Sequence, residues 1–187
     1  QGHATPSRFT PMNADVRNEF RQRAGFDPIE LFPEGSQRRS SQNEGGLRKF
    51  LNYRVELAQR LQLQWIGEIE ALRRLKPDLG LTLTHVDNEL DERTRDAIGA
   101  DAASLLPHLA GRGLTFLIED PATAWNLGPD RYERIADAYR KLTPQAGRLG
   151  IDINIVERYQ DVYPTKRQTG GELLQLVHTA ARVFPRV

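Results

Sequence analysis

Three apolar stretches rich in β-branched residues constrain the fold more than any other feature of the chain. They cover residues 81–88 (LTLTHVDN), 114–121 (LTFLIEDP) and 149–157 (LGIDINIVE), and they begin 33 and 35 positions apart. Each stretch precedes a helical pattern, and strands that alternate with helices at this spacing pair in parallel. The sequence therefore predicts an α/β fold of consecutive β–α units around one largely parallel sheet.

Helical patterns account for most of the remaining chain. A short helix is expected over residues 14–24, because Asn13 suits its N-cap and Gly25 its C-terminal stop. Residues 47–76 predict one long helix, about 45 Å at 1.5 Å per residue. Further helices are expected over residues 99–111, from Gly128-Pro129-Asp130 onward, and over residues 172–184.

The length of the chain suits one domain, and we predict a single α/β domain over residues 4–187. Residues 33–46 are polar and rich in glycine and serine, which predicts a mobile surface loop inside this domain. Residues 1–3 look like the remnant of a cleaved purification tag, so they are left out of the fold prediction.

Composition removes several classes of function. The 26 Lys and Arg residues nearly balance 25 Asp and Glu residues, so the overall charge does not indicate a nucleic-acid partner. The absence of cysteine excludes disulfides and thiolate ligands. No apolar run approaches the roughly 20 residues that span a bilayer, so no membrane span is predicted. The glycine-rich motifs that bind dinucleotides or phosphates are missing, and no cofactor is expected.

Ionisable side chains lie at the ends of all three predicted strands. The first strand ends with His85 and Asp87, the second with Glu119 and Asp120, and the third with Glu157. In sheets of parallel β–α units, ligands bind at the C-terminal ends of the strands, where the loops converge. We therefore expect a functional site at this edge of the sheet.

Side-chain alternation distinguishes the candidates on the second and third strands. Glu119 shares a face with Thr115, so we expect Glu119 to point inward to the site and Asp120 to brace the following turn. On the third strand, Asp152 and Asn154 share a polar face opposite three isoleucines. Asp152 is thus either a buried structural acid or a residue of the site.

Paired carboxylates at strand ends are suited to glycoside hydrolysis, in which one acid protonates the leaving oxygen and the other activates water or attacks carbon. We predict Glu119 as the acid or nucleophile, with Asp87 and Glu157 as candidate partners. Trp125 and Tyr159 are candidate platforms for sugar rings. The other candidate residues for binding a glycan substrate are His85, Asp152 and Asn154.

Two other functions stay open. The chain is alternatively a non-catalytic α/β module for assembly or interaction, with structural charges at its strand ends and a long helix that mediates contacts. A less favoured alternative is a metal-dependent hydrolase that uses His85 and Asp87. No metal site is assigned from the sequence, because the remaining histidines lie in helical patterns or in the first three residues.

Two motifs, in residues 19–28 (EFRQRAGFDP) and 75–84 (LKPDLGLTLT), carry a resemblance to a known family. They resemble the EFRxRxGxDP-type and IKPxxxLxxT-type segments of the glycoside-hydrolase-like, family 10-like (β/α)8 barrel proteins. No residue of these motifs corresponds to Glu119 or Glu157, which are predicted from strand-end position alone.

The resemblance implies that the chain is the second, C-terminal part of a TIM-type (β/α) barrel with one long helix. It also implies a bacterial carbohydrate-active protein that works outside the cytoplasm or in the periplasm. Three strands do not close a barrel, which takes eight. An open sheet exposes apolar edges, so we expect either an N-terminal barrel half or self-association.

Overall fold

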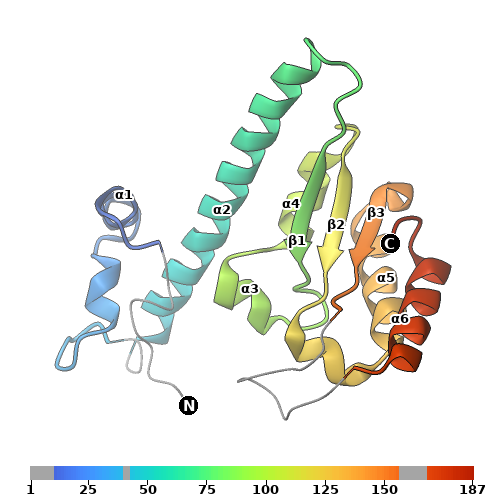
Figure 1. Ribbon diagram of the computed structural model, residues 1–187. Coiled ribbons are helices and arrows are strands. Elements are labelled where there is room, and N and C mark those ends of the chain that lie inside the picture. Colours follow the sequence, from blue (N-terminus) through green and yellow to red (C-terminus); the bar gives the residue numbers. More distant parts are fainter. Residues whose placement is uncertain (1–10, 40–42, 156–167) are drawn as a thin grey trace.

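The computed structural model describes residues 11–39, 43–155 and 168–187 (Figure 1). It contains one sheet of three strands, β1 (Thr82–Val86), β2 (Thr115–Glu119) and β3 (Leu149–Asp152). The helices are, in chain order, α1 (Ala14–Ala24), η2 (Pro28–Leu31), α2 (Glu44–Arg73), α3 (Arg93–Ile98), α4 (Ala102–Leu109), η3 (Ala122–Leu127), α5 (Asp130–Leu142), η4 (Ala146–Arg148) and α6 (Gly170–Val183).

The strands lie side by side in the order β1-β2-β3 and all run parallel, which confirms the predicted α/β fold. Only three strands are present among the described residues, fewer than the eight that close a (β/α)8 barrel. The predicted third strand is too long, since β3 ends at Asp152 and not at residue 157. Asp152 is the register partner of Glu119, the last residue of β2. β2 itself ends at Glu119 and the chain enters η3 at Ala122, so residues after Asp152 have no strand to pair with.

Helices cover one face of the sheet. α4 and α5 lie behind the strands in Figure 1, and α6 lies beside α5. The strand residues on this face are buried, as Phe116 and Ile118 illustrate. On the opposite face Thr82 and Thr84 are exposed. We call the helix-covered cluster the main core; its buried residues include Ile66, Leu105, Leu109, Phe116, Ile118, Tyr132, Ile135, Tyr139, Ile151, Leu176 and Ala180.

A second cluster, the N-terminal core, joins α1, η2 and the first half of α2. Phe20 is its centre, with ring centroids 5.2 Å from Phe26, 5.1 Å from Phe50 and 5.4 Å from Tyr53 in edge-to-face contacts. The other buried members are Val16, Leu31 and Leu57. The motif in residues 19–28 thus supplies packing residues of this core.

Asp27 fixes the chain direction between α1 and η2. Its side chain caps η2 at Ile29 and accepts hydrogen bonds from Arg17, at 3.0 and 2.7 Å, and from Arg21. Arg17 lies in the first turn of α1 and Arg21 in its last turn, and Gly25 caps the helix in the left-handed conformation, φ 80°. The polar residues of the motif therefore hold α1 against η2.

The long helix α2 has 30 residues and is shifted relative to its predicted range of 47–76. It begins at Glu44, because the side chain of Asn43 caps it by accepting from Gly46 N at 2.8 Å. The end of the predicted mobile loop, residues 44–46, is therefore helical, and residues 40–42 of that loop lie outside the described residues. Although α2 is long, neither it nor any other described helix is apolar enough to cross a membrane.

Candidate functional site

The C-terminal ends of the three strands meet at one edge of the sheet, at the lower end of the strands in Figure 1. Asp87 N donates to Glu119 O at 2.8 Å, which extends the β1–β2 pairing by one residue. Glu119 and Asp152 are register partners on β2 and β3. Register partners point to the same face of a sheet, and neighbouring strands lie about 4.8 Å apart. The two carboxylates are therefore neighbours on the face that no described helix covers.

A groove of about 440 Å³ opens beside Glu119, and we call it the strand-end groove. Three of the predicted site residues line it together: Glu119 from β2, Trp125 from η3 and Asn154 from the segment after β3. Val86, Ile98 and Pro121 add apolar surface, and Asp91, Arg93 and Asp120 add charge. A mostly apolar groove with a few polar groups is the usual form of a small-ligand site.

An ion pair in the protein interior compensates the charge of the Asp120 carboxylate. Asp120 is 1% exposed and forms an ion pair with Arg131, which is 2% exposed and reaches it from the start of α5. Arg131 also donates to Gly128 O at 2.8 Å and to the Tyr132 hydroxyl at 3.0 Å. Asp120 in turn accepts from Asn154 Nδ2 at 3.0 Å, so the ion pair fixes the amide that lines the groove.

The other carboxylates of the groove differ in their partners. Asp91 accepts two hydrogen bonds of 2.8 Å from Arg93, and this contact holds the pKa of Asp91 at about 2. The Glu119 carboxylate forms no hydrogen bond or ion pair with any described side chain, although its backbone oxygen pairs with Asp87. Glu119 is therefore the acid in the groove that remains available to a ligand.

His85 and Asp87 face the helices and do not line the strand-end groove. His85 Nε2 lies 2.8 Å from Asn88 Oδ1, an acceptor that also receives the Ala102 N–H at 2.9 Å, so Nε2 carries the hydrogen. Burial lowers the pKa of His85, which favours the neutral ring. His85 Nδ1 has no partner among the described residues.

Asp87 is fully buried and holds the turn after β1. Its carboxylate accepts from Glu89 N and Leu90 N, both at 3.1 Å. Burial raises the pKa of Asp87, and burial together with the charge of Asp87 raises the pKa of Tyr139. The structure thus places Asp87, a predicted catalytic partner, in a bracing position away from the groove.

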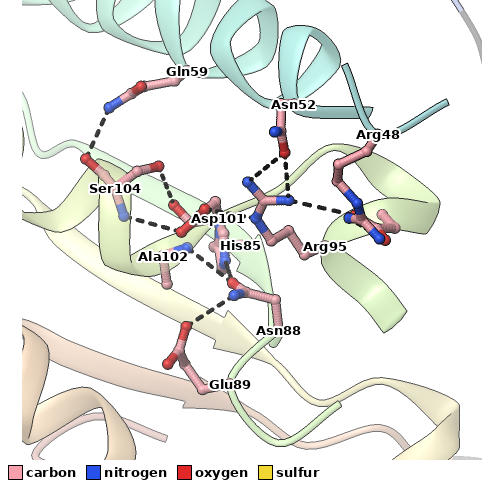
Figure 2. Close-up of polar contacts among 11 residues, drawn as sticks. Arg48, Asn52, Gln59, His85, Asn88, Glu89, Arg95, Asp101, Ala102 and Ser104 are labelled. Carbon is pink, nitrogen blue, oxygen red and sulfur yellow. Dashed lines mark hydrogen bonds and ion pairs between the residues drawn. The ribbon is translucent and has the colours of Figure 1, made fainter. Parts of the chain in front are cut away.

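A second groove of about 490 Å³ lies between α2, α3 and α4, and we call it the α3–α4 groove (Figure 2). The prediction missed its two strand-end residues, Asn88 and Glu89, which directly follow Asp87. Asn88 Nδ2 donates to Glu89 Oε1 at 2.9 Å, and burial raises the pKa of Glu89. The run of polar residues continuing past the predicted strand was the signal that could have found them.

Ion pairs occupy most of the wall of the α3–α4 groove. Arg95 Nε donates to Asp101 at 2.8 Å, and Arg48 Nη1 donates to Asp96 at 2.8 and 2.9 Å. Buried Arg54 on α2 donates to the carbonyls of residues 96 and 97, at 2.7 and 3.1 Å, and so fixes the last turn of α3. Figure 2 shows two further contacts that join α2 to this region, between Asn52 and Arg95 on α3 and between Gln59 and Ser104 on α4. Because Arg48, Arg93 and Arg95 are each paired with an aspartate, this wall of the groove is mainly a structural junction.

The remaining predicted residues are placed as follows. Asp152 is exposed at the end of β3, so its alternative role as a buried structural acid is wrong. Glu157 and Tyr159 lie outside the described residues, and their roles stay predictions. No group of three His, Cys, Asp or Glu side chains among the described residues is arranged to hold a metal ion. No family model, curated protein or solved structure matches the chain when it is compared with each of them.

Proposed function

We propose that this chain binds a glycan in the strand-end groove and hydrolyses it with Glu119 and Asp152 as the pair of carboxylates. The observation that carries the proposal is their register on adjacent strands. Strands about 4.8 Å apart suit the separation of about 5–5.5 Å found in retaining glycosidases, in which one acid attacks the sugar and the other protonates the leaving oxygen. Asp152 takes the place of Asp87, which is buried.

Trp125 and Asn154 act as the binding residues in this proposal. Trp125 lines the groove from η3 and offers an aromatic surface on which a sugar ring stacks. The side-chain amide of Asn154 is oriented by its hydrogen bond to Asp120, and Asp120 is held in turn by its ion pair with Arg131. Sugar recognition combines hydrogen bonds to hydroxyl groups with contact against the C–H face of the ring. The oriented amide of Asn154 supplies the hydrogen bonds, and the aromatic surface of Trp125 supplies the contact.

The barrel interpretation extends this proposal to the fold. Consecutive parallel strands with helices on one face are the arrangement of a sector of a (β/α)8 barrel. The other face carries Thr82, Thr84, Thr115, Glu119 and Asp152 together with Val86 and Leu117, a mainly polar face suited to a barrel interior. We propose that the chain is the C-terminal sector, as its resemblance to the family 10-like barrels implies, and that further strand–helix units complete it.

The test is hydrolysis of a panel of polysaccharides by the full-length natural protein and by Glu119→Gln and Asp152→Asn. Each substitution is expected to lower kcat by at least about 100-fold, because each removes an acid–base or nucleophilic group. Added azide distinguishes the two roles by its product: the variant that lacks the nucleophile is expected to give a glycosyl azide of inverted configuration, and the variant that lacks the acid–base group one of retained configuration. Asp137→Asn, on the exposed side of α5, is the control and keeps full activity.

Two results would contradict the proposal. Unchanged turnover in Glu119→Gln or Asp152→Asn removes that residue from the mechanism. The second result is a full-length protein that is folded by circular dichroism but neither binds nor hydrolyses any glycan tested. This result would exclude a glycan as the ligand and would favour the alternative of an interaction module.

A further inference from the structure

One apolar stripe runs along α2, and only its first half is covered. Phe50 and Leu57 belong to the N-terminal core, where α1 and η2 pack on them. The stripe continues at steps of three and four residues through Leu61, Trp65, Glu68 and Leu72, which share one face of the helix, and Leu75 follows in the turn after it. The second half of α2 extends beyond α1 in Figure 1.

The apolar residues of this second half are unusually exposed. Leu61 is 46% exposed, Trp65 68% and Leu72 53%, and Leu75 in the turn after the helix is 85% exposed. Steps of four, three, four and three residues form the heptad seam that packs against another helix. We call Leu61, Trp65, Glu68, Leu72 and Leu75 the α2 seam.

The area of the α2 seam fits a pair of identical chains. Side chains of this size present on the order of 200 Å² when fully exposed, so the seam offers roughly 500 Å² of apolar surface per copy. Two seams facing each other bury about 1,000 Å², the lower bound for a specific protein–protein contact. The same stripe already accepts a helix, α1, over its first half, so a second helix over the rest continues an existing mode of packing.

We propose that the α2 seam is the interface between two copies of this chain, paired antiparallel about a two-fold axis. A two-fold contact uses the same surface on both copies, and the antiparallel arrangement aligns the helix dipoles favourably. With the axis beside Ile66, Leu61 faces Leu72 of the second copy and Trp65 faces its Glu68. The indole N–H then donates to the Glu68 carboxylate, twice per dimer, which gives the one charged residue of the seam a partner.

The test is sedimentation equilibrium of the chain between about 1 and 200 μM, for wild type, Trp65→Ala and Glu68→Lys. Wild type is expected to form a dimer with a dissociation constant inside this range. Trp65→Ala is expected to weaken it at least about 30-fold, since a central tryptophan commonly carries 2 kcal/mol or more of an interface. Glu68→Lys replaces the acceptor for the indole with a donor and is expected to weaken the dimer as well.

Leu174→Ala is the matched control, because Leu174 is 56% exposed on α6, away from the seam. It is expected to leave the dimer unchanged, and all variants are expected to keep the wild-type Tm at concentrations low enough for the wild type to be monomeric, because their side chains lie on the surface of the monomer. A wild-type chain that stays monomeric to 200 μM overturns the proposal, as does a dimer that Trp65→Ala leaves intact. Burial of Trp65 by additional sequence of the natural protein, with a monomer in solution, overturns it in favour of an intramolecular partner.

Discussion

The buried ion pair between Asp120 and Arg131 gives the sharpest stability prediction. Both side chains are almost fully buried, and Arg131 also donates hydrogen bonds to Gly128 O and to the Tyr132 hydroxyl. Arg131→Met preserves much of the volume but leaves the Asp120 carboxylate with the Asn154 amide as its remaining side-chain partner. Removing one partner of a buried pair costs about 3–5 kcal/mol, because an uncompensated charge stays in the interior.

The double variant Asp120→Leu/Arg131→Met removes both charges. Replacing a buried pair by apolar residues is often neutral, so the double variant is expected to recover most of the loss, to within about 1–2 kcal/mol of wild type. Urea unfolding of the four proteins of this double-mutant cycle measures the coupling. Glu133→Gln, which breaks the exposed pair with Arg182, is expected to cost under about 1 kcal/mol. Additive losses at Asp120 and Arg131 would refute the claim that the two charges depend on each other.

Two further predictions concern the N-terminal core. Phe20→Ala is expected to cost about 3–5 kcal/mol in urea unfolding, because Phe20 is 1% exposed and contacts three aromatic rings; a loss under 1 kcal/mol would show that this core contributes little. The hydrogen bond from Arg17 lowers the pKa of Asp27 from 3.8 to about 2. A lowered folded-state pKa stabilises above pH 3.8, so about 2 kcal/mol should be lost as the pH falls toward 2, and Asp27→Asn should flatten that part of the stability–pH curve.

The sequence predicted the elements whose signals are local. α1 has the predicted bounds, since its start and its glycine stop are adjacent to the helical pattern. The parallel sheet followed from three stretches at regular spacing. The end of β3 was missed because Ile153 and Ile155 continue the apolar alternation, whereas the ladder depends on where β2 stops.

The candidate site was predicted in part. Glu119, Trp125 and Asn154 do line one groove, because the C-terminal ends of parallel strands converge. The burial of Asp87 follows from alternation with Leu83 and His85 on the helix-covered face. The partner of Asp120 is Arg131, eleven residues away on another element, and no local pattern in the strand indicates that contact.

The most direct test of the strand-end groove is a glycan titration followed by the indole N–H signals in a ¹H–¹⁵N NMR spectrum. The chain has two tryptophans, Trp125 in the groove and Trp65 on α2, so each titration contains its own reference. The Trp125 signal, assigned by its loss in Trp125→Phe, is expected to shift in a saturable manner with a bound oligosaccharide, while that of Trp65 stays in place. Equal shifts of both signals, or no shift of the Trp125 signal with any glycan, would contradict a glycan site at the ends of the strands.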